Sequence, residues 1–166
     1  MIGIIAAVSQ NGVIGKNNSL PFNYKEDMKW FRSTTSNKEF PPTVIMGKNT
    51  FISMGSRKLP GRRNMVITKS TIEGVETRSS IANVMEELAQ SNADIWFIGG
   101  TNIYREGMKY ADTIYLTLIP EIVEGDDLAY FPWVDPGKFN VEAYIPLYND
   151  NGDVSLNVAK YVRMNK

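Results

Sequence analysis

Short apolar runs, each rich in β-branched residues, recur along the chain and limit the folds that it can adopt. They cover residues 2–8, 43–46, 64–67, 95–98 and 113–119. This length and composition are typical of central strands that are buried on both faces of a sheet. Segments of helical pattern, residues 25–34, 80–90 and 102–109, lie between several of these runs. The alternation of strand and helix predicts an α/β fold with a largely parallel sheet.

The C-terminal part of the chain has a different pattern. Residues 138–147 and 154–163 flank the sequence Asn149-Asp-Asn-Gly152, which is a strong turn signal. We therefore expect a long antiparallel hairpin that closes the sheet. A chain of 166 residues, 43% of them hydrophobic, fits one compact domain, and no repeat or low-complexity linker divides it. We expect a single domain over residues 1–166.

Composition excludes several classes of function. The 18 basic and 18 acidic side chains balance, whereas a dedicated nucleic-acid binder needs a basic excess or patch. The chain has no cysteine and no histidine, which excludes a thiol nucleophile, a catalytic-triad base and the usual zinc ligands. We expect no metal site. No apolar run approaches the ~20 residues of a membrane span, and the N-terminus lacks the basic leader of a signal peptide, so we expect a cytoplasmic protein.

The segment Lys25-Glu-Asp-Met-Lys-Trp-Phe-Arg32 contains the most informative ionisable residue. On a helix, Lys25, Lys29 and Arg32 cluster on one side, and Asp27 falls in the middle of an apolar opposite face. Burial of a carboxylate on an apolar face costs folding free energy unless the carboxylate has a hydrogen-bond or ion-pair partner, and burial raises its pKa. The alternative is a first-turn aspartate that is favoured by the helix dipole and reaches solvent. The helix alone leaves both interpretations open.

Three further segments could bind anions, although each has an ordinary structural explanation. Gly99-Gly100 lies between a predicted strand and a predicted helix with Thr101 at its cap, where a phosphate can approach backbone amides. No complete G-x-G-x-x-G is present. Met46-Gly-Lys-Asn-Thr50 is not a P-loop, because Pro42 and Asn49 stand where the motif needs glycine and Ser/Thr. Leu59-Pro-Gly-Arg-Arg63 is a turn whose arginines could clamp a carboxylate, although turn arginines are more often solvated.

Taken in order, these segments resemble the bacterial-type dihydrofolate reductases over roughly the whole chain. Each segment is a weak match, but the ordered set is highly specific. The matching sequences are Ile5-Ala-Ala-Val8, Asn11-Gly-Val-Ile-Gly15, Leu20-Pro-Phe-Asn23, Asp27, Trp30-Phe31, Val44-Ile-Met-Gly47, Thr50-Phe51, Leu59-Pro-Gly-Arg62, Ile98-Gly-Gly100, Tyr104, Tyr115-Leu-Thr117, Glu124-Gly-Asp126 and Phe131-Pro132.

The resemblance implies a specific fold and reaction. The fold would be an eight-stranded, mostly parallel central sheet with a C-terminal antiparallel hairpin and helices on both faces. An adenosine-binding subdomain would span roughly residues 42–92. The enzyme would reduce 7,8-dihydrofolate by hydride transfer from NADPH, in support of one-carbon and thymidylate metabolism, and antifolates could inhibit it. The cofactor carries the hydride, which agrees with the lack of protein nucleophiles. A monomer is the default expectation.

The family's site residues carry over to the matching positions. Asp27, assisted by Thr117, would hydrogen-bond the pterin ring and favour substrate protonated at N5, and Leu20 and Phe22 complete the implied catalytic set. Arg62 would pair with the glutamate α-carboxylate of the substrate, and the loop 9–23 would close over the nicotinamide. The implied substrate-binding residues are Ile5, Ala6, Asp27, Met28, Phe31, Arg32, Met54, Leu59, Arg62, Ile98 and Thr117.

The implied cofactor site is larger. Gly99 and Gly100, joined by a cis peptide, would meet the pyrophosphate. Lys48, Thr68 and Lys69 match positions that often bind the adenosine 2′-phosphate, which favours NADPH. The full set is Ala7, Ile14, Gly15, Asn18, Ser19, Leu20, Gly47, Lys48, Asn49, Thr50, Thr68, Lys69, Ser70, Ile98, Gly99, Gly100, Thr101, Asn102, Ile103 and Tyr104.

Several positions depart from the family pattern. Phe22 stands where tryptophan is common, and phenylalanine cannot donate the indole hydrogen bond that helps to hold an active-site water. Asn49 and Asn102 replace residues that are frequently basic. Ser56-Arg-Lys58 makes the spacing before Leu59 slightly longer than usual. These departures concern the water network, the tightness of cofactor binding and the residue that contacts the substrate tail.

Two alternatives remain at this point. The pyrimidine reductases of riboflavin synthesis share the fold, but they lack the helix that pairs Asp with Trp-Phe and the Leu-Pro-Gly-Arg segment. A non-catalytic nucleotide-binding module would not require Asp27 on an apolar face opposite Thr117. Oxidation of NADPH in the presence of dihydrofolate distinguishes the reductase from both.

Overall fold

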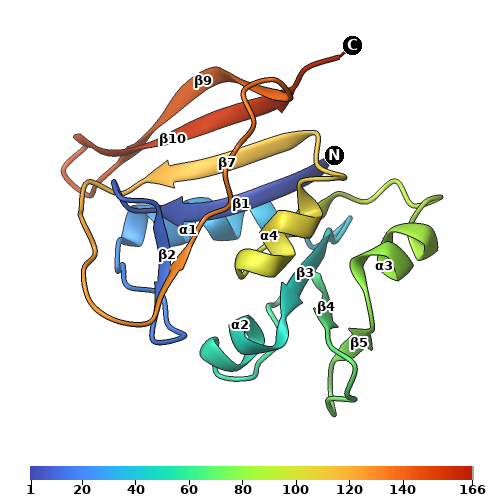
Figure 1. Ribbon diagram of the computed structural model, residues 1–166. Helices are drawn as coiled ribbons and strands as arrows, with labels where there is room; N and C mark the ends of the chain where they lie inside the picture. The colour runs from blue at the N-terminus through green and yellow to red at the C-terminus, as the bar shows by residue number, and fades with distance from the viewer. Residues whose placement is uncertain (166) are drawn as a thin grey trace.

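A computed structural model describes residues 1–165 of the chain. An eight-stranded sheet runs through its centre in the order β5-β4-β3-β6-β1-β7-β10-β9 (Figure 1). Its strands are β1 (Ile2–Val8), β3 (Thr43–Gly47), β4 (Arg63–Ile67), β5 (Glu76–Arg78), β6 (Ile95–Phe97), β7 (Thr113–Leu118), β9 (Phe139–Tyr148) and β10 (Val154–Arg163). A separate two-stranded sheet pairs β2 (Val13–Lys16) with β8 (Leu128–Tyr130).

The strands from β5 to β7 are paired in parallel, and β10 is antiparallel to both of its neighbours. The predicted sheet and its C-terminal hairpin are therefore confirmed. The predicted strand boundaries agree with the structure to within one residue. The hairpin turn uses Gly152 at a φ of 82°, a left-handed conformation that favours glycine.

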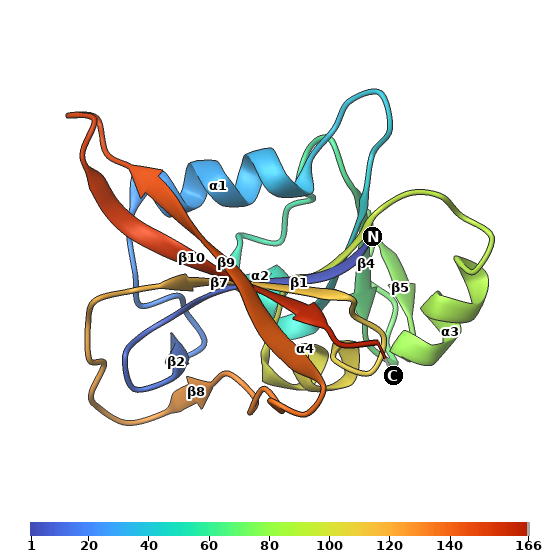
Figure 2. The ribbon, with the colours of Figure 1, turned by 90° about the horizontal axis from the view of Figure 1, so that it is seen from above.

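Helices cover both faces of the sheet, as expected. They are α1 (Lys25–Thr35), α2 (Lys48–Ser53), α3 (Ile81–Glu87) and α4 (Thr101–Gly107). Seen from above, α1 lies on one side of the sheet and α3 and α4 lie on the other (Figure 2). Helix α3 is shorter than the predicted 80–90. Ser80 is its N-cap and accepts a hydrogen bond from Asn83 N at 3.1 Å, and the helix ends at Glu87.

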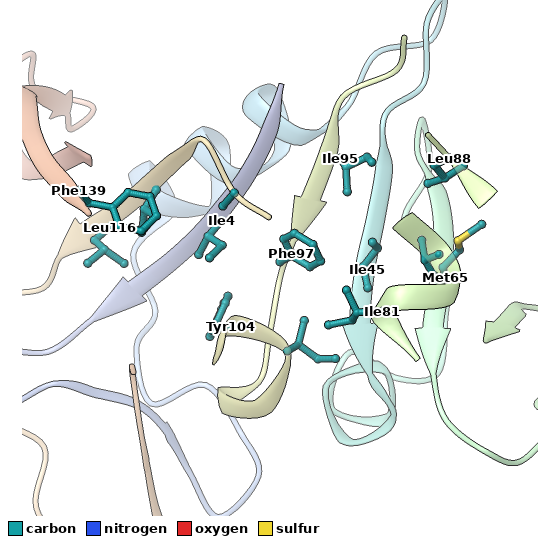
Figure 3. Close-up of a cluster of buried hydrophobic side chains, with 14 of the residues drawn as sticks. Ile4, Ile45, Met65, Ile81, Leu88, Ile95, Phe97, Tyr104, Leu116 and Phe139 are labelled. Atoms are coloured by element: carbon teal, nitrogen blue, oxygen red, sulfur yellow. The ribbon is translucent and has the colours of Figure 1, made fainter. Parts of the chain in front are cut away.

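The core consists mainly of aliphatic and aromatic side chains from the central strands and the helices that cover them. Ile4, Ile45 and Phe97, which come from β1, β3 and β6, are fully buried and lie in one cluster with Tyr104 of α4 (Figure 3). Their neighbours in the same strands, Ile5, Val44 and Trp96, form a second buried cluster, so the apolar runs supply both faces of the sheet. None of the helices within residues 1–165 is long and apolar enough to cross a membrane.

Candidate active site

A cleft of about 870 Å³ opens beside the carboxyl ends of β1, β3 and β6. This is the edge of a parallel sheet at which ligands usually bind. The cleft is lined by most of the residues that the sequence singles out: Ile5, Ala6, Ala7, Ile14, Gly15, Asn18, Ser19, Leu20, Asp27, Met28, Phe31, Arg32, Gly47, Lys48, Asn49, Thr50, Met54, Leu59, Arg62, Ile98, Gly99, Gly100, Thr101, Asn102, Ile103 and Tyr104.

Five predicted residues do not line the cleft. Thr117 is fully buried beneath it, and Phe22 is buried in a cluster with Ala7 and Leu156. Thr68, Lys69 and Ser70 follow β4 outside its walls. The cleft also contains three residues that the sequence analysis missed, Ser53, Ile67 and Ala129.

Asp27 is half-buried in the first turn of α1 and faces the cleft. Burial raises the pKa of its carboxyl group above the usual 3.8, and the nearby negative charge of Glu26 raises it further. The hydroxyl of Thr117 opposes this rise by stabilising the charged form. No direct hydrogen bond of normal geometry joins the two side chains, and Thr117 Oγ1 is a buried atom without a hydrogen-bond partner in residues 1–165. Of the two interpretations of Asp27, the structure supports the acid on an apolar, cleft-facing side.

Glu26, the residue before Asp27, forms a hydrogen bond with strand β10. The hydroxyl of Ser155 in β10 donates a hydrogen bond to its carboxylate. This bond is the main reason that the pKa of Glu26 lies below its usual value. Glu26 is therefore charged at neutral pH, and its charge adds to the field at Asp27.

The deeper part of the cleft beside Asp27 is apolar. Ile5, Phe31, Met54 and Ile98 line it, and Met28 and Leu20 lie at its rim with exposed fractions of 54% and 58%. Apolar walls around a few polar groups are typical of a site for a small aromatic ligand.

Arg62 and Arg32 lie at the mouth of the cleft. The guanidinium of Arg62 donates to Pro60 O at 2.8 Å and to Thr35 Oγ1 at 3.2 Å, and it lies 6.0 Å from the centroid of the Phe31 ring. Burial lowers the pKa of Arg62, and the positive charge of Arg32 lowers it further. Within residues 1–165, neither arginine forms an ion pair with a carboxylate. Two close cations of this kind favour an anionic ligand.

Arg63 points away from this mouth. It donates two hydrogen bonds to Glu76, at 2.8 and 2.9 Å, and one to Glu87 at 3.2 Å. Arg78 bonds the same two carboxylates. Arg63 therefore belongs to an ion-pair network on the outer edge of the sheet and is not available to a ligand in the cleft.

Three glycines, Gly47, Gly99 and Gly100, line the opposite end of the cleft. Gly47 N donates to Gly99 O at 2.8 Å, and the Gly99–Gly100 peptide bond is cis, as predicted. A Cβ on Gly99, whose φ is 119°, would lie 3.2 Å from the Tyr104 hydroxyl. Backbone without side chains over it fits the close approach of a pyrophosphate. Lys48, Asn49 and Thr50 line this end and can donate hydrogen bonds to phosphate oxygens.

Thr101 differs from its predicted role as the helix cap. The N-cap of α4 is Gly100, which has no side-chain capping bond, and Thr101 is the first helical residue. Its hydroxyl donates instead to Tyr130 O of β8 at 3.0 Å. The prediction was wrong by one residue because the helix begins directly after the glycine pair.

Comparisons with known proteins agree on one family. The family model for dihydrofolate reductase matches residues 1–163. A dihydrofolate reductase of Buchnera aphidicola subsp. Acyrthosiphon pisum is 44% identical over 133 residues, which are 79% of this chain and 78% of that protein. The enzyme of Bacillus subtilis is 35% identical over 144 residues, 85% of this chain and 81% of that protein.

A solved structure has the same fold. Dihydrofolate reductase from Enterococcus faecalis, complexed with NADP(H) and RAB-propyl, superposes with a TM-score of 0.86 and is 28% identical in sequence. The match covers 99% of this chain and 97% of that chain.

Proposed function

This chain belongs to the dihydrofolate reductase family, and we propose that the cleft is its active site and that Asp27 is the ionisable residue on which turnover depends. The enzyme reduces 7,8-dihydrofolate to 5,6,7,8-tetrahydrofolate, and NADPH supplies the hydride when bound. The observation that carries the proposal is the carboxylate of Asp27, half-buried on the cleft wall with a raised pKa.

Asp27 acts on the substrate through charge and hydrogen bonding. The C=N bond of dihydrofolate is a better hydride acceptor when N5 is protonated. A carboxylate that accepts hydrogen bonds from the pterin ring in an apolar pocket favours this protonated form. The buried hydroxyl of Thr117 lies beneath the carboxylate and stabilises its charge. The proton itself comes from water.

The arginines at the mouth of the cleft recognise the tail of the substrate. Arg62 presents a planar fork that matches a carboxylate in two parallel hydrogen bonds. Its bonds to Pro60 and Thr35 fix the orientation of this fork before the ligand arrives. We assign the glutamate α-carboxylate to Arg62, with Arg32 as a neighbouring positive charge.

The glycine-lined wall at Gly47, Gly99 and Gly100 fits the pyrophosphate of the cofactor. Lys48 lies in the cleft wall and favours NADPH over NADH, because only NADPH carries a 2′-phosphate. Lys69 lies outside the wall, so we expect it to contribute less. The loop that contains Leu20 would exclude bulk water from the reacting atoms. Phe22 packs in the core and supplies no hydrogen-bond donor, so water near the pterin is held without an indole at this position.

Neither alternative is favoured. The family model and the relatives are dihydrofolate reductases, not pyrimidine reductases. We also propose that the protein is a cytoplasmic monomer, and that inhibitors that mimic the pterin bind against Asp27. The assignment of residues 42–92 to an adenosine-binding subdomain stays a proposal.

Exchange of one carboxylate for an amide tests the proposal. Asp27→Asn should keep the fold but lose most turnover at neutral pH, measured as the loss of absorbance at 340 nm with NADPH and dihydrofolate. The defect should shrink at acidic pH, where the substrate protonates without help. Asp153→Asn, at an exposed aspartate beside the hairpin turn, is the matched control and should retain wild-type rates. Wild-type rates for Asp27→Asn at pH 7 would contradict the assignment.

A further inference from the structure

The cofactor side of the cleft is connected to the small β2–β8 sheet through Thr101. This residue is half-buried at the start of α4 and lines the cleft. Its hydroxyl donates to Tyr130 O at 3.0 Å. A threonine at the start of a helix usually caps that helix, but here the N-cap is Gly100 and the hydroxyl is directed to another element. This hydrogen bond therefore joins α4 to β8.

Strand β8 in turn determines where β2 lies. The two strands are antiparallel, with Val13 opposite Tyr130 and Gly15 opposite Ala129. Phe131 N also donates to Gly12 O at 2.9 Å. A two-stranded ribbon has little stability by itself, so its position depends on its contacts with the rest of the molecule. The views in Figures 1 and 2 show β2 and β8 beside one another, off the main sheet.

A second contact supports the same connection. The ring of Tyr104 packs against Phe131, just after β8, with centroids 5.1 Å apart. The hydroxyl of Tyr104 donates to Ile5 O of β1 at 3.0 Å. Helix α4 thus contacts the central sheet and the residue that follows β8. The hydroxyl of Thr101 adds a directional bond to β8 itself, at the end nearest the cleft.

Helix α4 and the β2–β8 sheet, which this hydrogen bond joins, both line the cleft. Thr101 belongs to one wall, and Ile14, Gly15 and Ala129 belong to the wall formed by β2 and β8. We propose that Thr101 is a positioning residue: its hydroxyl holds the β2–β8 wall against α4, and NADPH binds between the two walls with an affinity that depends on this bond. The proposal rests on the cofactor site assigned above.

Thr101→Val tests the proposal, since it replaces the hydroxyl by a methyl group of similar size, and Thr101→Ser restores the hydroxyl. Without ligand, backbone amides of β2 and β8 should exchange hydrogen about three- to tenfold faster in Thr101→Val and at the wild-type rate in Thr101→Ser. NADPH affinity, measured by quenching of tryptophan fluorescence, should fall by a similar factor in the valine variant alone. The KM for dihydrofolate should change less than the Kd for NADPH.

A control separates this effect from a general loss of stability. Ser80→Ala removes the N-cap hydrogen bond of α3, which is remote from the cleft, and should leave exchange in β2 and β8 unchanged. Equal amide hydrogen-exchange rates of β2 and β8 in wild type and Thr101→Val would overturn the proposal. Faster exchange in Thr101→Val without any change in NADPH affinity would overturn it as well. Exchange in the free protein does not depend on the cofactor. If wild type itself bound no NADPH, the proposed function would fail, while the hydrogen bond would still be tested.

Discussion

At the scale of single residues, Asp27 is placed where its charge is costly. Burial is the main cause of its raised pKa, and the folded protein therefore binds a proton at this site more tightly than the unfolded chain does. A protein that kept this carboxylate only for stability would do better with a neutral side chain. The same environment would strengthen the proposed interaction of Asp27 with a bound, protonated pterin.

We expect Asp27→Asn to stabilise the free protein at neutral pH. A carboxyl group with a raised folded-state pKa lowers stability at pH values above its unfolded pKa, near 3.8, and the full loss is present above the folded pKa. The variant should therefore unfold at higher urea concentration at pH 7. Its advantage should disappear as the pH falls to about 3.8. A variant that was less stable than wild type at pH 7 would show that Asp27 has a structural partner.

Glu26 offers a way to change the pKa of Asp27 without touching the ligand. Its charge raises that pKa, and Ser155 keeps Glu26 ionised. Glu26→Gln should therefore lower the pKa of Asp27, and the acidic limb of the pH–rate profile should move to lower pH. Because burial is the larger cause, the shift should be modest. Titration of the Asp27 carboxyl carbon by NMR checks the shift directly, with Glu86→Gln on the exposed side of α3 as the control.

At the scale of elements, the start of β4 separates two arginines by strand alternation. Arg62 lies at the cleft, and Arg63 joins the network with Glu76, Glu87 and Arg78 on the outer edge. Successive side chains of an extended segment point in opposite directions, so adjacent arginines have unrelated surroundings. The resemblance assigned the substrate tail to Arg62, and the structure leaves Arg62 alone of the two arginines at the cleft.

Arg62→Leu should raise the KM for dihydrofolate by the equivalent of ~1–3 kcal/mol, the scale of a charge-assisted hydrogen bond. Affinity for pteridine inhibitors without a glutamate should change little, and Arg62→Lys should recover little, since an ammonium lacks the fork. Arg63→Leu is the matched variant. It should leave KM unchanged and reduce the free energy of unfolding by roughly 1 kcal/mol or less, because its ion pairs are partly exposed. The assignment of the substrate tail to Arg62 would be contradicted if Arg63→Leu raised the KM for dihydrofolate and Arg62→Leu did not.

The elements that the sequence did not predict are short or depend on distant partners. The strands β2, β5 and β8 have three or four residues each, and α2 has six with no side-chain cap at its start. Strand β2 exists because it pairs with β8, more than a hundred residues away, and no local pattern records that pairing. Ala129 reaches the cleft through this pair, which explains why it was missed.

The position of Thr117 shows how much a local pattern can predict. Tyr115 and Thr117 are two residues apart in β7, so they share one face of the sheet. Trp30 of α1 packs edge-on against Tyr115, with centroids 5.2 Å apart, which places that face under α1. The alternation of side chains along β7 could therefore, by itself, place Thr117 beneath α1. Its place beneath Asp27 could be inferred only from the family resemblance, because periodicity does not set the register between a helix and a sheet.

At the scale of the whole molecule, the two halves of the sheet meet where β6 pairs with β1. Three residue pairs make this junction, and Gly3 lies opposite Trp96 in the middle. The Trp96 ring lies directly over Gly3 and stacks on Tyr115 of β7, on the far side of β1, at 5.7 Å between centroids. The absence of a side chain at position 3 therefore allows one indole to span three strands.

Gly3→Ala should weaken this junction. A Cβ at position 3 would lie 2.3 Å from the nearest carbon of the Trp96 ring, a distance at which the ring must move. Trp96 is almost fully buried, so the displaced ring has no free space to enter. We expect the free energy of unfolding to fall by ~1–3 kcal/mol, the usual range for overpacking a core. Urea unfolding with a tryptophan fluorescence signal measures the change.

The same substitution in a Trp96→Leu background distinguishes this steric cause from a general intolerance of alanine at position 3. Trp96→Leu alone should destabilise the protein, because it leaves a cavity and removes the stacking on Tyr115. With the ring gone, Gly3→Ala should be neutral or slightly stabilising, since alanine in a strand loses less backbone entropy on folding than glycine. The double-mutant cycle should thus give a coupling energy of ~1–3 kcal/mol between residues on neighbouring strands. An equal loss from Gly3→Ala in both backgrounds would mean that glycine is needed for the β1 backbone itself, and not for the ring that crosses it.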